Sequence, residues 1–204
     1  MTMQTLYVTN LPQQTDEETL RALFSQYGEV ESVEFGTNER FDVPYALVTM
    51  SSEKATTKAN HNLNGYLLDE HHLSISYPDV DEATVERGLS KKQRQTAEAV
   101  VKELGEHIRK PVRRIHTMIL LCGHSFVLHL VEEAKAIDAG EGMMTQDGER
   151  RRTLGGVFFT LANGRMAPPI YQIVHNRGGK LPGHTREDDR ALQHLVSNPH
   201  PDLD

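Results

Sequence analysis

Short stretches of alternating apolar and polar residues dominate the first eighty positions of the chain. Residues 5–11, TLYVTNL, have the period of two that is typical of a strand with one buried face. An apolar stripe at helical spacing then runs from Leu20 to Tyr27, and Thr15 with Glu18 has the spacing of a capping box. The expected elements are a strand at 5–11, a helix from Thr15 to Gly28, strands at 30–35 and 45–50, a helix at 55–63 and a strand at 73–77.

This order, βαββαβ, is that of the split ferredoxin-like fold. Residues 6–11, LYVTNL, resemble the first signature of the RNA recognition motif, and residues 43–50, VPYALVTM, align with the second signature. The second signature departs from the family pattern, because Val43, Pro44, Leu47 and Met50 stand where a basic residue, a glycine and two aromatic residues are usual. The resemblance implies a ferredoxin-like RNA-recognition-motif (RRM) domain over residues 1–79.

The outer face of this sheet decides between two functions. Neighbouring residues of a strand point to opposite faces of the sheet. We therefore expect four side chains on the outer face: Tyr7, Glu34, Tyr45 and Leu47. Recognition motifs stack RNA bases on outward aromatic rings, so Tyr7 and Tyr45 are candidate RNA-binding residues. Leu47 offers no ring and Glu34 repels phosphate. The alternative is therefore a protein-interaction or self-association module that does not bind RNA.

The pattern changes to helical spacing after a polar junction at residues 80–89. Helices are expected at 90–109, 111–121 and 124–139, followed by a hairpin at 143–152, where Asp147-Gly148 supplies a turn. Residues 90–204 are thus expected to form a mostly α-helical domain, which makes the whole chain an α+β protein. Further helices are expected at 168–174 and from Thr185, with a basic loop at 176–180.

The segment GERRRTLGGVF, residues 148–158, predicts an anion site. Thr153 is suited to cap a helix that begins at Leu154 and places Gly155 and Gly156 in its first turn. The start of a helix presents unpaired N–H groups and partial positive charge, and glycine lets an anion approach the backbone. The preceding residues, Arg150, Arg151 and Arg152, can donate bidentate hydrogen bonds to the same anion. The alternative is tight helix packing through the two glycines, with solvated arginines around them.

The same segment resembles the signature of the RNA-binding domain of the phosphorylated adaptor for RNA export (PHAX), over roughly residues 90–163. Leu154 stands where that family has proline. The resemblance implies a helical domain that binds single-stranded RNA through its backbone. It assigns this role to Arg150, Arg151, Arg152, Thr153, Gly155 and Gly156, and assigns basic contacts on an earlier helix to Arg113 and Arg114.

The charge balance changes near residue 80, where the hydrophobic pattern also changes from strand spacing to helical spacing. The net charge is −7, and residues 1–80 hold 4 Lys and Arg against 12 Asp and Glu, whereas residues 81–204 hold 18 against 17. The single cysteine, Cys122, excludes an internal disulfide and fits a reducing compartment, so a cytoplasmic location is expected and a nuclear one is left open. No run of apolar residues predicts contact with a membrane.

Catalytic and metal-binding patterns are missing from the sequence. The 11 histidines lack the partner cysteines or the H-E-x-x-H spacing of zinc sites, and no nucleophile motif or phosphate loop is present. We therefore expect a non-catalytic RNA-binding protein without metal or cofactor. Its helical domain is expected to hold single-stranded RNA by phosphate contacts, with weak stacking contributed by the first domain.

Overall fold

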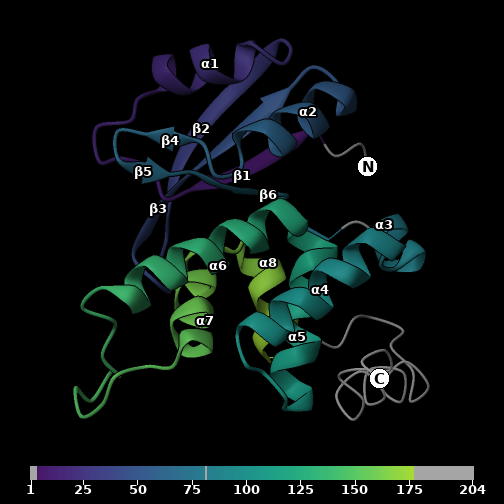
Figure 1. Cartoon of the computed structure of the whole chain (residues 1–204). Coiled ribbons are helices and arrows are strands. Elements are labelled where there is room, and N and C mark those ends of the chain that lie inside the picture. Colours follow the sequence, from purple (N-terminus) through teal and green to yellow (C-terminus); the bar gives the residue numbers. More distant parts are fainter. Residues whose placement is uncertain (1–3, 81, 177–204) are drawn as a thin grey trace.

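The computed structural model describes residues 4–80 and 82–176, and its first part is a four-stranded antiparallel sheet with two helices on one face (Figure 1). The strands lie in the order β2-β3-β1-β6, which together with the element order confirms the predicted βαββαβ fold. A short hairpin, β4–β5, precedes β6. The elements are β1 (Thr5–Thr9), α1 (Glu17–Ser25), β2 (Val30–Asn38), β3 (Val43–Met50), α2 (Glu53–Leu63), β4 (Leu67–Leu68), β5 (His71–His72) and β6 (Ser74–Ser76).

Helix α1 begins one residue later than the capping box predicted. The carboxylate of Asp16 accepts a hydrogen bond from the Thr19 amide at 2.8 Å, so Asp16 and not Thr15 caps the helix. The Thr15 amide donates to the Pro12 carbonyl, which holds Thr15 in the turn before the helix. An aspartate cap also adds negative charge at the positive end of the helix, which favours this start.

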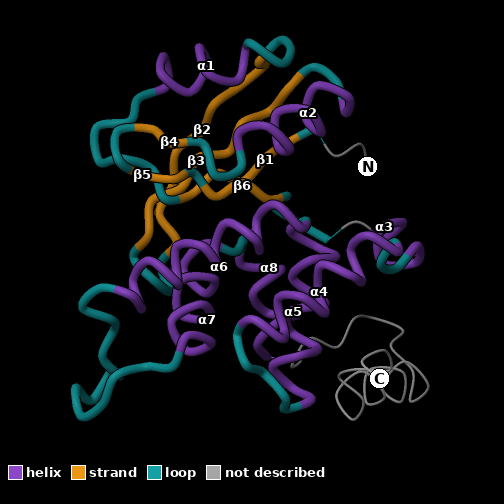
Figure 2. Tube along the Cα trace, viewed as in Figure 1, coloured by secondary structure: helices purple, strands orange, loops and turns teal. Residues whose placement is uncertain are grey.

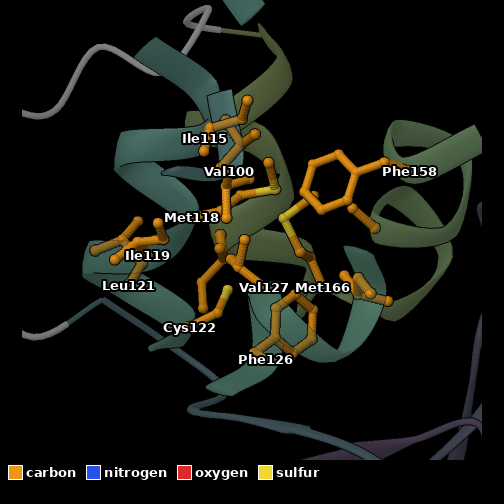
Figure 3. Close-up of a cluster of buried hydrophobic side chains, with 14 of the residues drawn as sticks. Val100, Ile115, Met118, Ile119, Leu121, Cys122, Phe126, Val127, Phe158 and Met166 are labelled. Carbon is orange, nitrogen blue, oxygen red and sulfur yellow. The ribbon is translucent and has the colours of Figure 1, made fainter. Parts of the chain in front are cut away.

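The helical domain, residues 82–176, holds its own apolar core. Figure 3 shows Val100, Met118, Phe126 and Phe158 converging from four different helices. Cys122 is buried among them as expected, and burial raises the pKa of its thiol. The elements are α3 (Glu82–Arg87), α4 (Lys91–Glu103), α5 (Arg109–Cys122), α6 (His124–Ala139), α7 (Leu154–Arg165), α8 (Pro168–Tyr171) and a single π-turn, η1 (Gln172–Asn176).

The first long helix of this domain is shorter than the predicted 90–109. Ser90 and Gln93 form a capping box at its start, and the helix ends at Glu103. Gly105 then adopts φ +66°, a left-handed conformation that glycine reaches without strain and that turns the chain away from the helix axis. The following residue, Glu106, is thereby directed back toward the domain. The helix expected from Thr185 and residues 177–180 of the expected basic loop at 176–180 lie outside the described residues, and Asn176 is the last residue of η1.

The helical domain packs against the outer face of the sheet. Figures 1 and 2 show α1 and α2 on one side of the sheet and the helices of the second domain on the other. Tyr7 is only 2% exposed and belongs to the core of the helical domain, and Tyr45 and Leu47 pack against the same core. Alternation along the strands was therefore predicted correctly, but the expectation that this face is open is wrong. Its apolar side chains are covered because they complete the core of the second domain.

Polar contacts fix the two domains to each other. Arg165, at the end of α7, is 7% exposed and forms a bidentate ion pair with Glu133 at 2.5 and 2.6 Å. The same guanidinium donates to the Ser74 hydroxyl in β6, and the Arg165 carbonyl accepts from the Thr9 hydroxyl in β1, both at 3.3 Å. These bonds satisfy polar groups that the contact removes from water.

Candidate nucleic-acid interface

The predicted hairpin carries the arginines. We define the arginine hairpin as residues 143–152. The Thr145 amide donates to the Arg150 carbonyl at 2.8 Å and the Arg152 amide to the Met143 carbonyl at 2.7 Å. Gly148 has φ +71° and donates to the Thr145 carbonyl, which closes the turn that Asp147-Gly148 predicted. Arg151 pairs with Met144 in a single antiparallel bridge, with Arg150 in the bend before it and Arg152 after it. Neighbouring side chains of a paired segment alternate between its two sides.

This alternation gives Arg151 a structural contact. Its guanidinium donates to the carbonyls of Asp138 and Gly140 at the end of α6, and it lies 3.5 Å from the Asp138 carboxylate. It crosses Gly142 at φ +74°, where a Cβ would collide with the arginine side chain. Arg151 thus joins the hairpin to α6.

Arg150 and Arg152 flank Arg151 along the chain and do not share its contact with α6. Arg150 is exposed, and its side chain forms no ion pair or hydrogen bond with residues 4–80 or 82–176. Arg152 is half-buried and uses only its Nε, which donates to the Met144 carbonyl at 3.0 Å. The terminal guanidinium nitrogens of both residues can therefore bind an anion.

The first turn of α7 is built as the sequence predicted, but it has an unexpected neighbour. The Thr153 hydroxyl accepts from the Gly156 amide at 3.2 Å, which confirms the cap. Gly155 is buried, and a Cβ there would collide with Oε1 of Glu106. A carboxylate of the protein thus lies beside the positive end of this helix. Burial raises the pKa of Glu106, which the nearby His107 partly opposes.

Arg113 and Arg114 are less available than the resemblance implied. Arg113 is buried at 9% exposure. Arg114 donates from Nε to the Val174 carbonyl at 3.2 Å and from a terminal nitrogen to the His175 carbonyl at 3.5 Å, and burial lowers the pKa of its guanidinium. Arg114 therefore satisfies carbonyls of η1, as expected of a cation at the end of a helix.

Tyr7 and Tyr45 form a pair inside the domain contact. Their ring centroids lie 4.8 Å apart at an interplanar angle of 32°, and the Tyr45 ring covers Gly36, where a Cβ would come within 2.5 Å of it. Burial raises the pKa of Tyr7. The Tyr7 ring is not accessible to a base, whereas Tyr45 is half-buried and borders a cleft that is also lined by Arg40, Phe41 and Tyr171.

The described residues hold no cluster of His, Cys, Asp or Glu that could bind a metal ion, and no helix among them is long and apolar enough to cross a membrane. Three functional candidates were missed from the sequence. Glu106 carries no local signal, because its position depends on how α4 and α7 pack. Arg40 and Phe41 were missed because they stand out only through their contacts with the ring of Tyr171, which lies far along the chain.

Comparison with known families assigns both domains. Residues 6–74 match the RNA recognition motif, and residues 96–178 match the RNA-binding domain of the phosphorylated adapter RNA export protein. The chain therefore combines an RNA recognition motif with an adapter-type RNA-binding domain, as the two signatures predicted.

Individual relatives resemble the first domain. Over 75 residues the chain is 32% identical to the U11/U12 small nuclear ribonucleoprotein 35 kDa protein of Rattus norvegicus, covering 36% of this chain and 31% of that protein. Over 70 residues it is 36% identical to the RNA-binding protein lark of Drosophila melanogaster, covering 34% and 18%. The solved Mip6 RRM3 domain is 28% identical with a TM-score of 0.35, covering 38% of this chain and 94% of that one. The chain thus spans about a third or less of these curated relatives.

Proposed function

We propose that the protein is a non-catalytic binder of single-stranded RNA and that the arginine hairpin holds the strand by its phosphates. The observation that carries this proposal is the division of the three arginines. Arg151 is bound to the end of α6, whereas Arg150 and Arg152 keep guanidinium nitrogens without a partner among the described residues. Guanidinium groups bind phosphate oxygens through paired, charge-assisted hydrogen bonds.

Spacing supports a single strand as the ligand. Residues i and i+2 of an extended segment are about 6.6 Å apart, which suits two neighbouring phosphates of one strand. The first turn of α7, which follows Arg152 directly, adds partial positive charge next to the same site. Because Glu106 already lies beside Gly155, we place the phosphates on the hairpin side of this turn and not against the glycine.

We propose no separate function for the outer face of the sheet. The alternative of a protein-interaction or self-association module needs that face to be open, and the helical domain of the same chain covers it. Base stacking on Tyr7 is unsupported for the same reason.

The test is the salt dependence of RNA affinity. We expect Arg150→Ala with Arg152→Ala to weaken binding of a labelled oligouridylate about tenfold, and to reduce the slope of log K against log salt by about 1.4, because each single-strand phosphate contact contributes about 0.7. Fluorescence anisotropy between about 50 and about 200 mM salt measures both quantities.

The matched control removes the same charge elsewhere. Lys54→Ala with Lys58→Ala changes two exposed residues of α2, on the opposite side of the sheet (Figure 1). Its slope should equal that of the wild type. Equal affinity and slope in the arginine variant and the wild type would contradict the proposal.

A further inference from the structure

Four histidines lie where the two domains meet, in two pairs that each join one domain to the other. His72 of β5 faces His129 of α6, with ring centroids 4.7 Å apart, and His61 of α2 faces His124 of α6 at 6.3 Å. Both pairs therefore use α6, the helix that lies beside the sheet domain in Figure 1. We call these four residues the histidine seam.

The first pair is held in place by the backbone around it. His72 Nδ1 donates to the Gly65 carbonyl at 3.1 Å, and the Asn10 side-chain amide donates to the His72 carbonyl at 2.8 Å. Gly65 itself lies against the His129 ring, where a Cβ would come within 3.0 Å of Nδ1. Separating the two rings therefore requires a movement of β5 away from α6, which loosens the contact between the domains.

His129 also borders the buried ion pair that fixes the domains to each other. Its Nε2 is buried without a hydrogen-bond partner among the described residues. It lies 3.9 Å from Oε2 of Glu133, and Arg165 already binds the same oxygen at 2.5 Å. Arg165 in turn donates to the Ser74 hydroxyl of β6 at 3.3 Å. A proton on Nε2 would make His129 a second cation that competes for Glu133, which weakens the hold of Arg165 on its partner.

The surroundings of His129 disfavour a proton. Among the described residues, the charged and titratable groups near it are His72 of β5, Arg165 of α7, and Glu132 and Glu133 of α6 itself. Burial is the main cause that lowers the pKa of His129, and His72 and Arg165 lower it further. Glu133 and Glu132 oppose this only in part, because the Glu133 carboxylate is already paired with Arg165.

The second pair has a similar electrostatic setting. In the described part of the chain, the groups that act on His124 are Lys92 of α4 and His61 of α2. Burial is again the main cause that lowers the pKa of His124, and Lys92 and His61 add to it. Both pairs thus resist taking up protons while the domains are in contact.

We infer that the histidine seam is a proton-sensitive latch, which keeps the two domains together at neutral pH and releases them in mild acid. In the closed molecule each pair excludes protons that the same histidines accept once the domains separate. Opening uncovers Tyr7, Tyr45 and Leu47, which pack into the core of the helical domain when the molecule is closed. Acidification thereby turns the outer face of the sheet into an accessible surface.

Proton linkage fixes the direction of the effect. A histidine whose pKa is lowered in the closed molecule stabilises that form above its ordinary pKa of about 6.5, and this stabilisation is lost as the pH falls. Each excluded proton favours the open form by up to about tenfold per pH unit below about 6.5. We therefore expect opening between about pH 6.5 and about pH 5.

The distance between the domains in the intact chain tests the latch. Donor and acceptor dyes are attached at Gln26→Cys, at the end of α1, and Lys102→Cys, on α4, two exposed positions. Cys122 is 1% exposed and does not compete for the dyes. We expect single-molecule energy transfer to show one compact population at about pH 7.5 and a second, more extended one at about pH 5. Circular dichroism at both pH values should be unchanged, because opening leaves the helices and strands folded.

Variants of the histidines separate the latch from other effects of acid. His72→Gln with His129→Gln keeps a polar group at both positions but takes up no proton, and should reduce the extended population at about pH 5 by at least about fivefold. His61→Gln with His124→Gln, at the more exposed pair, should reduce it as well. His71→Gln, at an exposed residue outside both pairs, is the matched control and should open as the wild type does.

Three results would overturn the inference. The first is a wild type that stays compact at about pH 5, and the second is an extended population that is unchanged in both double variants. The third is a loss of the circular dichroism signal together with the appearance of the extended population, which would mean that a domain unfolds. None of these measurements involves RNA, so the latch and the proposed function stand or fall separately.

Discussion

Glu106 lies against Gly155, so a carboxylate of the protein occupies the space above the first turn of α7. The absence of a side chain at Gly155 makes this approach possible. The sequence predicts an external anion at this helix start, and in the structure an internal one lies there. The carboxylate and an RNA phosphate are attracted by the same partial charge and repel each other.

Removing the charge of Glu106 should therefore strengthen RNA binding. We expect Glu106→Gln to raise affinity up to about fivefold near neutral pH, the equivalent of about 1 kcal/mol for a charge at a helix end. The gain over the wild type should shrink as the pH falls, because the raised pKa of Glu106 lets its carboxyl become neutral before most other carboxylates. Anisotropy titrations at several pH values measure this gain in affinity, and Glu98→Gln, at an exposed residue, is the control. A gain that does not change with pH would contradict the prediction.

Arg150 and Arg151 should separate binding from stability. We expect Arg151→Ala to lower the free energy of unfolding by about 1 kcal/mol, because it removes hydrogen bonds to two carbonyls and an exposed ion pair. Arg150→Ala should leave the free energy of unfolding within about 0.5 kcal/mol while reducing RNA affinity. Urea denaturation measures the free energy of unfolding of both variants, and fluorescence anisotropy measures their RNA affinity. The opposite assignment, with Arg150 stabilising the fold, would show that the hairpin presents its other side.

Tyr7 should behave as a core residue. We expect Tyr7→Ala to cost about 3–5 kcal/mol of stability, as truncation of a buried aromatic does. Tyr7→Phe should leave RNA affinity unchanged, since both the ring and the hydroxyl of Tyr7 are buried and out of reach of RNA. Tyr66→Ala, at a residue 44% exposed, is the control for stability. A loss of RNA affinity in a folded Tyr7→Phe protein would mean that the sheet face binds RNA.

His116 should make stability depend on pH. It is 6% exposed in α5, and burial, with Arg94 as a smaller cause, lowers its pKa to about 4. The unfolded chain therefore binds this proton first, so stability falls as the pH drops from about 6.5 to about 4, by about 3 kcal/mol in total. We expect His116→Gln to flatten this part of the curve in urea denaturation, and exposed His107→Gln to leave it unchanged. Parallel curves for His116→Gln and the wild type would contradict the assignment.

Local features of the fold were predictable because neighbouring residues determine them. The strand alternation, the Thr153 cap and the Asp147-Gly148 turn all follow from spacing along the chain. The start of α1 failed by one residue because Thr15 and Asp16 are both good caps and only the preceding turn selects between them. The choice between two adjacent capping residues depends on the backbone geometry of the preceding turn, which cannot be read from the sequence.

Features that depend on the meeting of the two domains were not predictable. An outward tyrosine at position 7 has the same local pattern whether it stacks on a base or completes another core. In the same way, the sequence pattern assigns all three arginines to an anion. In the structure, Arg151 instead binds a carbonyl and a carboxylate at the end of α6. Packing between distant parts of the chain therefore determines which of the predicted tyrosines and arginines remain available to bind RNA.

The bonds from Arg165 to β6 and from Thr9 to Arg165 have a practical consequence for dissecting the protein. Cutting the chain at the junction would uncover Tyr7 and Leu47 on one fragment and the helices that cover them on the other. Newly bared apolar patches promote aggregation. Poor solubility of either fragment would then be mistaken for lost RNA affinity, so point substitutions in the intact chain are the sounder route to assigning each contact.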